Sequence, residues 1–381
     1  MRIFVVSRGT PSEKDPQWGS FELDQAKALK EYGHEVIILS LDRRFRFYWR
    51  HIGTTCRTIC DIPVYNAFYV PDALLGVLGQ NIKKRILNCL FDRLLCSVIS
   101  NHGAPDIMYC HYLPNTELGV CSKQKHNIPV VGIEHWSKVG QKNLDKTICE
   151  KAKFAYSQCN ALIAVSSDLQ SLIKTNLDID SYVVNNMLGS GFTYSEKSSD
   201  GKLNFVSVGN LLPIKGFNYL IEAFSMINVS KDKWSLKILG GGSEKDNLQK
   251  QIDSLGLTDN VKLLGRKQKD EVIKHLHESN VFVVSSLTET FGVAAIEAMA
   301  CGLPVISTKC GGPNDFLTDE NGIFCEVANP QSLASAILYM IDNYKKYDCK
   351  KISTSTKERF SQSSIAKQLS EIFENVIKKK K

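Results

Sequence analysis

The amino-acid sequence predicts an α/β protein made of two doubly wound domains that face a central cleft. Its 381 residues suffice for two domains, since one domain typically takes roughly 150–200 residues. Short apolar runs, typical of buried parallel strands, alternate with amphipathic helical segments in both halves of the chain. We expect domains at 1–188 and 203–363, a Gly-, Ser- and charge-rich linker at 189–202, and a C-terminal helix with a basic tail at 364–381.

The first half opens with a βαβ unit. MRIFVVS (1–7) is typical of a buried strand. Residues 17–40 predict a glycine loop at Gly19, an amphipathic helix that stops at Gly33, and a second strand. Gly19 is equally compatible with a plain turn.

Three further strands follow in this half. PDIMYCHY (105–112) and PVVGIEHWS (129–137) each lead to a histidine, His111 and His135. A lone histidine at a strand end is more often structural than functional. ALIAVSSDL (161–169) predicts a strand and then a helix start, where Ser166 also suits a simple N-cap.

The second half repeats the alternation with more glycine at the strand ends. Residues 205–224 predict a strand, a turn at Gly209 and a helix, with Lys215 in between. Residues 236–248 and 261–267 predict two more strand-to-glycine junctions, where ligands bind in open α/β sheets. The triple glycine at 240–242 lacks the spaced pattern of a dinucleotide-binding fold.

The most informative stretch is TETFGVAAIEAMACGLPVIS (288–307). VFVVSS (281–286) predicts a buried strand before it, so Gly292 marks a strand-loop-helix junction. Glu289 then lies in the loop, and Glu297 lies about five residues into the helix, roughly 7–8 Å along its axis. Free N–H groups at the helix start lie between the two carboxylates and favour an anion. This order suits a sugar nucleotide, although both residues are also compatible with ordinary loop and surface-helix carboxylates.

Gly302-Leu303-Pro304 ends the predicted helix, and Gly311-Gly312-Pro313 opens a predicted flexible loop. With these flanks the stretch closely resembles the donor site of family-4 retaining glycosyltransferases. The resemblance extends over nearly the whole chain and is strongest in its second half. It implies the GT-B fold, in which two Rossmann-like domains bind the acceptor (the first domain) and the nucleotide sugar (the second). It also implies that the C-terminal helix packs back on the first domain.

The resemblance assigns roles to individual residues. It implies that Lys215 binds the donor diphosphate, that Glu289 holds the hydroxyls of the donor sugar, and that His135 positions that sugar from across the cleft. His111 matches a more peripheral histidine. The family usually has an arginine after the first glycine, whereas this chain has Asn210, so one phosphate-binding cation is missing. The implied donor-binding residues are Gly19, Gly209, Asn210, Arg266 near the base, Thr290, Phe291, Gly292, Val293, and Glu297 at the ribose.

The implied reaction transfers a hexosyl or N-acetylhexosaminyl unit from a UDP- or GDP-sugar, with retention, to a glycan or lipid-linked glycan acceptor. Cell-surface polysaccharide synthesis, such as that of capsule or O-antigen, is the expected setting. We expect no metal cofactor, because Lys215 and backbone donors supply the positive charge. Asp178-Ile179-Asp180 matches a metal-binding triplet of the other main glycosyltransferase fold, but two aspartates in a turn are common.

Composition bears on partners and location. The net charge of +7 is concentrated at RRFRFYWRH (43–51) and at Lys378–Lys381. Basic residues among aromatics suit an anionic membrane surface or single-stranded nucleic acid. The apolar and then basic stretch at 68–95 favours the membrane, while the alternative is a core helix beside a solvated basic loop. We therefore expect an anionic membrane surface and no nucleic acid as partner.

The cysteines and the N-terminus favour a cytoplasmic protein, peripheral on the inner face of the cell membrane. The twelve cysteines lack paired CxxC motifs, which argues against a zinc site. Neither a signal peptide nor a membrane-spanning apolar run is visible.

Three rival functions remain open at this point. A nucleotide-dependent dehydrogenase should show a complete glycine fingerprint after its first strand, and SRGTPSEKD (7–15) does not. A GT-B sugar-nucleotide epimerase would need no separate acceptor. An inactive sugar-nucleotide-binding scaffold protein is kept open by Asn210.

Overall fold

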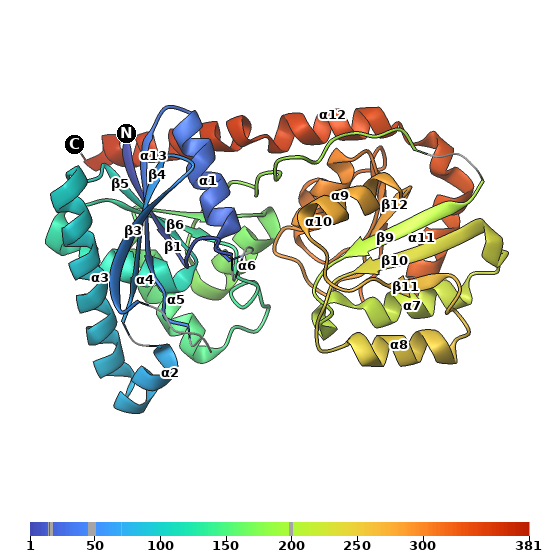
Figure 1. Cartoon of the computed structure of the whole chain (residues 1–381), viewed down its shortest axis with the longest axis horizontal. Coiled ribbons are helices and arrows are strands. Elements are labelled where there is room, and N and C mark those ends of the chain that lie inside the picture. Colours follow the sequence, from blue (N-terminus) through green and yellow to red (C-terminus); the bar gives the residue numbers. More distant parts are fainter. Residues whose placement is uncertain (14, 16–17, 45–50, 70, 198–200, 381) are drawn as a thin grey trace. The chain divides into compact units, whose positions relative to one another are not determined.

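The computed structural model describes residues 1–13, 15, 18–44, 51–69, 71–197 and 201–380. The chain divides into two compact units, one formed by Met1–Asn185 with Gln362–Lys381 and the other by Asn186–Ser361. Each unit has its own sheet and its own helices (Figure 1). The predicted α/β class with two doubly wound units is therefore confirmed.

The first unit is built on an eight-stranded sheet, counted over the described residues, in the order β3-β4-β2-β1-β5-β6-β7-β8. All neighbours pair in parallel except β3 and β4. The apolar runs predicted as strands form its buried centre, as expected for strands covered on both faces. The strands are β1 (Arg2–Ser7), β2 (Glu35–Leu41), β3 (Gly53–Ile59), β4 (Ile62–Phe68), β5 (Ile107–His111), β6 (Val130–Glu134), β7 (Ala161–Ala164) and β8 (Tyr182–Val183).

The hairpin of β3 and β4 is an element that the sequence does not predict. Its turn residues, Cys60 and Asp61, both have positive φ values, 50° and 57°. That conformation suits the twist of a two-residue hairpin. The signal is hard to find in the sequence because β3 is an exposed edge strand without an apolar run.

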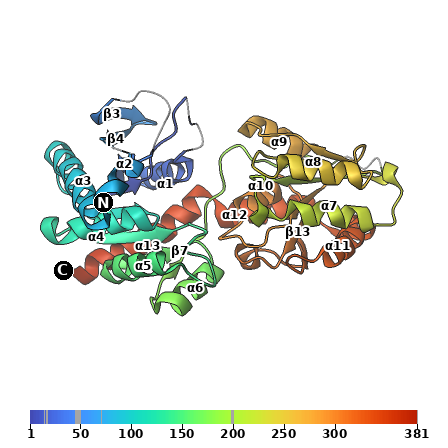
Figure 2. The ribbon, with the colours of Figure 1, turned by 90° about the horizontal axis from the view of Figure 1, so that it is seen from below.

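Helices cover both faces of this sheet (Figure 2). Tyr109 of β5 donates a hydrogen bond to Gln25 of α1, 2.7 Å long. The next residue, Cys110, points to the other face, where its sulfur lies 2.6 Å from the position of a Cβ on Gly119 of α4. The helices are α1 (Ser20–Glu31), α2 (Asp72–Leu75), η1 (Gly76–Leu78), α3 (Gln80–His102), α4 (Leu113–His126), α5 (Lys146–Gln158), α6 (Ser167–Leu177) and α13 (Gln362–Lys380).

The predicted apolar-to-basic stretch at 68–95 spans α2, η1 and most of α3. One side of α3 is a core face, with Phe91 and Leu95 fully buried. Leu74, Val77 and Ile82, by contrast, are 60%, 86% and 52% exposed. Of the basic segment 43–51, residues 45–50 lie outside the described residues. Among the helices that the structure describes, none combines the length and the apolar character needed to cross a bilayer.

The last helix of the chain, α13, belongs to the first unit. Phe373 of α13 is fully buried and packs edge-on against Tyr109, with 5.1 Å between ring centroids. The Ser370 hydroxyl lies 2.8 Å from Nε2 of His34. The end of the chain therefore contributes core residues to the unit that contains its beginning.

The second unit has a six-stranded, wholly parallel sheet in its described residues, in the order β11-β10-β9-β12-β13-β14. Numbered within this unit, the order is 3-2-1-4-5-6, which is that of doubly wound dinucleotide-binding sheets. Its strands are β9 (Leu203–Val208), β10 (Trp234–Leu239), β11 (Val261–Leu263), β12 (Val281–Val284), β13 (Val305–Thr308) and β14 (Gly322–Cys325). Its helices are η2 (Pro213–Lys215), α7 (Phe217–Met226), η3 (Lys231–Lys233), α8 (Lys245–Ser254), α9 (Lys269–His277), α10 (Val293–Ala300), η4 (Gly312–Asp315), α11 (Pro330–Asn343), η5 (Tyr344–Lys346) and α12 (Cys349–Phe360).

Two segments of the second unit differ from expectation. The predicted flexible loop at Gly311-Gly312-Pro313 is largely the 3₁₀-helix η4, in which Gly312 and Pro313 are buried. The predicted linker at 189–202 packs on the second unit where it is described. Phe192 is buried there, and the Lys197 ammonium donates to the carbonyl of Leu276 over 3.1 Å. One aromatic ring and one long side chain thus attach a segment whose composition predicts a free linker.

The packing of α13 leads to a testable prediction. Phe373→Ala should lower the free energy of unfolding of the first unit by about 3–5 kcal/mol, because it deletes a fully buried ring and leaves a cavity. Urea unfolding followed by circular dichroism measures the change. Lys379→Ala, an exposed position on the same helix, is the control and should be neutral. A loss below about 1 kcal/mol for Phe373→Ala would show that α13 is not part of this core.

Candidate active site

The topology of the second unit marks one place for a ligand. The strand order reverses between β9 and β12, and open α/β sheets bind ligands at the carboxyl ends of the strands beside such a switch point. Gly209 follows β9 directly, and Ser285 follows β12. The predicted donor residues Lys215, Glu289 and Gly292 lie in the loops that leave these two strands.

Close backbone contacts hold those loops together. A Cβ on Gly240 would lie 1.8 Å from the carbonyl oxygen of Gly209, so only glycine fits where the loops after β9 and β10 touch. A Cβ on Gly216, whose φ is +61°, would lie 2.2 Å from the carbonyl oxygen of Ser285. The Ser285 hydroxyl donates to the Lys215 carbonyl over 2.9 Å. These contacts fix the backbone of Lys215 against the end of β12.

Lys215 and Glu289 form the central ion pair of the site. The Lys215 ammonium lies 2.5 Å from Oε1 of Glu289, and the Ser286 hydroxyl donates to the same oxygen over 2.7 Å. Both side chains are mostly buried, at 26% and 16% exposure. The Glu289 backbone is also fixed, since its N–H donates to Cys310 over 2.7 Å and its carbonyl accepts from Gly312 over 2.9 Å. A mobile surface pair would lack this support.

The start of α10 adjoins this pair. Gly292, with φ of +97°, precedes the first helical residue, Val293. Within the described residues, the N–H groups of Gly292, Val293 and Ala294 donate to no carbonyl or side chain. Such free N–H groups, together with the helix dipole, favour an anion.

An aromatic cluster supports the start of α10 from behind. The ring of Phe291 is buried, with its centroid 5.4 Å from that of Phe316 and 5.7 Å from that of Phe360. A Cβ on Gly312 would lie 2.2 Å from the Cα of Phe291. Phe291 is therefore a core side chain whose backbone, and not its ring, is available to a ligand.

The other predicted donor residues lie around this centre or at the surface. Glu297 lies in the second turn of α10 and is half-buried, with Oε1 3.6 Å from the Cβ position of Gly189. Thr290 is also half-buried. Asn210 and Arg266 are exposed at the ends of β9 and β11. The structure thus brings Gly209, Lys215, Glu289 and the start of α10 together, while Asn210 and Arg266 remain at the surface.

In the first unit, Gly19 lies at the corresponding switch point, between β1 and β5. A Cβ on Gly19 would lie 2.0 Å from the carbonyl oxygen of Gly9. Arg8 organises this turn, because its guanidinium pairs with the fully buried Glu22 at 2.9 Å and stacks on the ring of Tyr112 at 3.7 Å. Sequence reasoning missed Arg8 and Glu22. The available signal was an arginine directly after a buried strand.

The two histidines predicted for this unit, His111 and His135, stack on each other. Their ring planes are 2° from parallel, with centroids 5.4 Å apart. His111 is fully buried, and neither ring nitrogen has a hydrogen-bond partner in the described part of the chain. Burial, assisted by the nearby charge of Arg8, lowers the pKa of His111 to about 3, so this ring stays neutral. His135 is half-buried as a residue, and its Nε2 atom is buried.

Glu134 fixes the chain around His135 and was not predicted. The carboxylate is fully buried and accepts hydrogen bonds from the backbone N–H groups of Leu113, His135 and Trp136, at 2.9, 2.8 and 2.6 Å. The Tyr156 hydroxyl donates to it as well. Burial raises the pKa of Glu134, and these hydrogen bonds oppose the rise. A carboxylate that ends a buried strand was the signal in the sequence.

Two other candidates have structural roles. The Ser166 hydroxyl accepts from the Leu169 N–H over 3.1 Å, so Ser166 is the N-cap of α6. Asp178 and Asp180 both pair with the Lys174 ammonium, at 2.8 and 3.1 Å, and both are almost fully exposed. Asp178 and Asp180 therefore form surface ion pairs with Lys174 at the end of α6.

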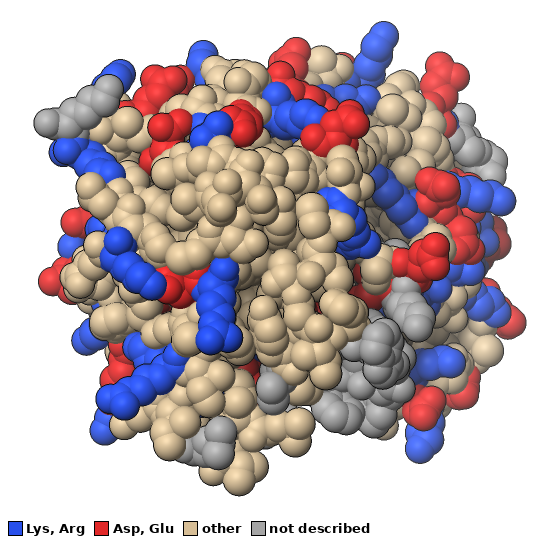
Figure 3. Space-filling model, turned by 60° about the vertical axis from the view of Figure 1, so that its left-hand side comes forward, with Lys and Arg blue, Asp and Glu red and all other residues tan. Residues whose placement is uncertain are grey.

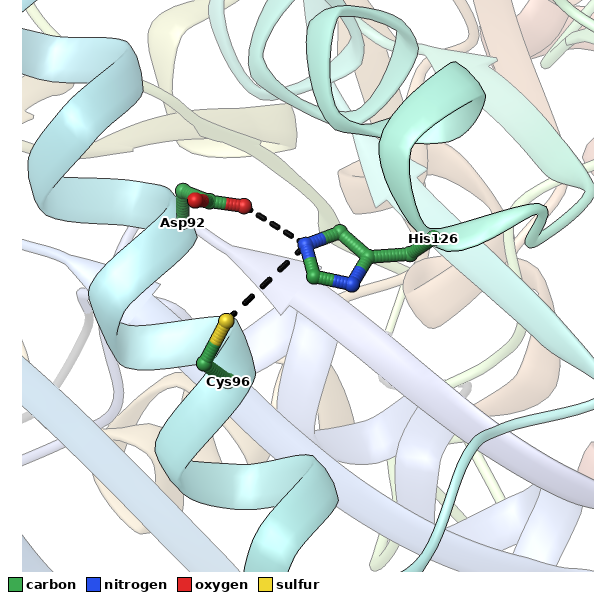
Figure 4. A group of neighbouring side chains, drawn as sticks. All are labelled: Asp92, Cys96 and His126. Carbon is green, nitrogen blue, oxygen red and sulfur yellow. Dashed lines mark hydrogen bonds and ion pairs between the residues drawn. The ribbon is translucent and has the colours of Figure 1, made fainter.

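One group of side chains in the described residues has metal-ligand character: Asp92 and Cys96 of α3 with His126 of α4 (Figure 4). Nε2 of His126 lies 2.6 Å from an Asp92 oxygen and 4.0 Å from the Cys96 sulfur. The Lys125 ammonium binds the other Asp92 oxygen. Burial by itself raises the pKa of Asp92. Lys125 and His126 lower this pKa by a larger amount, so that it lies below its ordinary value. Because lysine already balances the carboxylate charge, the cluster is an ion-pair network that joins α3 to α4.

Comparisons with known proteins agree with this geometry. Residues 194–359 match the family described as glycosyl transferases group 1. An uncharacterised glycosyltransferase of Methanocaldococcus jannaschii is 32% identical over 255 residues, which cover 65% of this chain and 68% of the relative. N-acetyl-alpha-D-glucosaminyl L-malate synthase of Bacillus anthracis is 25% identical over 375 residues, or 92% of each chain.

A solved structure extends the likeness to the whole fold. HepE of Anabaena, in complex with UDP and glucose, superimposes with a TM-score of 0.72 at 20% identity, over 98% of this chain and all of that one. The predicted GT-B fold is confirmed.

The buried His111 predicts a pH dependence of stability. Its pKa is about 3 in the folded protein and about 6.5 when unfolded, so the unfolded state binds the extra proton between these values. The contribution of neutral His111 to the free energy of unfolding should therefore be fully present above pH 6.5. It should fall as the pH drops, by about 2 kcal/mol between pH 6.5 and 5. His111→Phe should remove this contribution. Parallel pH profiles of wild type and His111→Phe in urea unfolding would contradict the assignment.

Proposed function

Because the chain belongs to the group 1 glycosyl transferases, which transfer sugar from nucleotide sugars, we propose that it is a retaining hexosyl- or N-acetylhexosaminyltransferase. The donor is a UDP- or GDP-sugar, and the acceptor is a glycan or a lipid-linked glycan. The ion pair of Lys215 and Glu289 beside the free N–H groups of α10 carries this proposal. It offers a cation and backbone donors for a diphosphate, next to a carboxylate for sugar hydroxyls.

The donor is assigned from the site and from the relatives. Diphosphate oxygens that approach the start of α10 compete with Glu289 for the Lys215 ammonium, and this exchange frees Glu289 Oε1 to accept sugar hydroxyls. Glu297, in the second turn of α10, is assigned to the ribose, and Arg266, beside Gly241, to the base. The name of the Bacillus relative contains an N-acetylglucosaminyl group, and HepE binds UDP and glucose. The first supports an N-acetylhexosamine as the transferred sugar, and the second supports a hexose and UDP as the nucleotide.

In the proposed mechanism the acceptor hydroxyl oxygen bonds to the anomeric carbon on the face from which the diphosphate leaves. The bond from that carbon to the phosphate oxygen breaks, and the diphosphate departs with the electron pair and accepts the hydroxyl proton. Lys215 and the N–H groups of Gly292 and Val293 stabilise the negative charge that develops on the diphosphate. His135 contacts the transferred sugar. This charge balance needs no metal, which is part of the proposal.

We also propose that the protein works at the inner face of the cell membrane, in cell-surface polysaccharide synthesis. The exposed Leu74, Val77 and Ile82 around α2 and the start of α3 support this, since apolar side chains beside cations suit an anionic membrane. The face that comes forward in Figure 3 carries Lys and Arg side chains around uncharged areas in its lower left part. Capsule and O-antigen are the proposed products.

An inactive sugar-nucleotide-binding protein is the second candidate, and Asn210 is the observation that favours it. An arginine at this position would add a charge beside Lys215, whereas asparagine donates hydrogen bonds without charge. Turnover of a donor distinguishes the enzyme from the binding protein.

The ion pair predicts the effect of removing its cation. Lys215→Ala should reduce kcat for donor hydrolysis or transfer about 100-fold, since it deletes a charge that stabilises the leaving diphosphate. Purified protein with a panel of UDP- and GDP-sugars, without metal, gives the measurement. Lys250→Ala, an exposed lysine on α8 of the same unit, is the matched control. If Lys215→Ala turned over donor at the wild-type rate, Lys215 would lose its assigned role.

The Asn210 position predicts a gain of function. Asn210→Arg should raise kcat/KM for the nucleotide sugar about tenfold, because a second cation can bind the diphosphate. Asn210 is exposed, so the longer side chain meets no packing barrier. Asn210→Gln, which lengthens the side chain and keeps its amide without adding charge, is the uncharged control. A gain with Gln equal to the gain with Arg would show that charge is not the cause.

A further inference from the structure

The first unit contains a pocket of about 340 Å³ that has no role in the function proposed so far. It lies among the starts of α3, α4 and α5, and its wall includes Leu113 and Trp136. These two residues each follow the end of a parallel strand, β5 or β6, by two positions. The volume falls within the range of small-molecule sites, and strand ends are where open α/β sheets bind ligands.

The pocket carries a positive charge excess. Four cations line it, Arg43, Lys83, Lys84 and Lys151, against the two carboxylates Asp72 and Glu117. Lys83 pairs with Asp72 at 3.3 Å, and Lys84 pairs with Glu117 at 2.9 Å. In the described part of the chain, no carboxylate pairs with Arg43 or Lys151. The pocket therefore keeps two cations available for an anion.

The rest of the lining suits a hydroxylated ring. Trp136 offers an aromatic face, with Leu113 and Ile148 nearby, and such faces pack against the apolar side of a sugar or cyclic polyol. Oδ1 of Asp72 is buried and has no hydrogen-bond partner within the described residues. A buried acceptor without a donor is uncommon in folded proteins, and a ligand hydroxyl would satisfy it.

One wall residue of the pocket, Trp136, directly follows in sequence the residue assigned to the transferred sugar, His135. The N–H groups of Leu113, His135 and Trp136 all donate to Glu134. One buried carboxylate therefore fixes the pocket wall and His135 together. The backbone positions of Leu113 and Trp136 in the pocket wall and of His135 therefore depend on the same carboxylate.

We propose that this pocket binds the acceptor and that the acceptor is a phosphorylated sugar or polyol. Arg43 and Lys151 bind its phosphate, Trp136 packs against its ring, and Asp72 accepts one of its hydroxyls. This inference rests on the proposed transfer reaction, to which the acceptor supplies the attacking hydroxyl. The same chemistry occurs in a soluble sugar phosphate and in the headgroup of a lipid.

Paired ligands that differ only in the phosphate test the proposal. Binding to the full chain is measured calorimetrically for glucose against glucose 6-phosphate and for inositol against inositol 1-phosphate. Vesicles that contain phosphatidylinositol or, at equal charge, phosphatidylserine test a lipid source. The phosphorylated member should bind at least about tenfold more tightly in the soluble pairs, or phosphatidylinositol should do so in vesicles. The arm that responds identifies the source.

Variants localise the binding. Lys151→Ala and Arg43→Ala should each weaken binding of the phosphorylated ligand about tenfold or more, and Lys151→Arg should retain it. Lys153→Ala, an exposed position on the same helix outside the pocket, is the matched control. Urea unfolding followed by circular dichroism, compared with wild type, confirms that each variant is folded in the unit that carries the change.

Two results would overturn the inference. One is equal binding of neutral and phosphorylated ligands in every arm, and the other is unchanged binding in Lys151→Ala and Arg43→Ala. If wild type nevertheless hydrolysed a donor, the proposed transfer reaction would stand while the acceptor role of the pocket would not. Phosphate-dependent binding in a wild-type protein that turns over no nucleotide sugar would instead contradict the transfer reaction, and with it the acceptor role.

Discussion

The close approach of backbones at the strand ends of the second unit is the constraint on which its site depends. Lys215 and Glu289 are 74 positions apart in the sequence, yet their side chains lie 2.5 Å apart. They meet because Gly216 lies on the Ser285 carbonyl and Gly312 lies on the Phe291 backbone, where no Cβ fits. The aromatic cluster behind Phe291 gives these loops a rigid base. Glycine thus provides proximity, and buried rings provide stiffness.

The two units differ in how exposed their charged groups are and in how these groups are paired. In the second unit, cation, carboxylate and free N–H groups remain partly exposed, which suits exchange of partners with a charged ligand. Near Gly19 and His135 in the first unit, the charges are paired or hydrogen-bonded, and the carboxylates are buried. Arg8 pairs with Glu22, and Glu134 receives three backbone N–H groups and a tyrosine hydroxyl. This satisfied network orients the chain segment that carries the half-buried His135.

Surface features of the first unit extend the same logic. The cations that line its pocket outnumber the carboxylates there, and exposed apolar residues of α2 and α3 lie near the same helix start. An anionic, hydroxylated acceptor and an anionic membrane would both be attracted by such a surface. The hairpin of β3 and β4 forms one edge of the sheet, with β4 next to β2, and the residues of β3 are mostly exposed.

The sequence by itself determined the α/β class and the succession of buried strands along the chain, since buried parallel strands and glycine junctions are local patterns. It also predicts donor residues in the second unit. It did not reveal the hairpin at β3 and β4, whose exposed residues carry no apolar periodicity. Composition also misassigned 189–202 as a linker, because one buried ring, Phe192, outweighs many polar neighbours. Only the tertiary structure decided that Lys215 pairs with Glu289, that Glu134 supports His135, and that Arg43 and Lys151 share a pocket. Such contacts join residues distant in sequence, and their distances follow from packing, which no local pattern encodes.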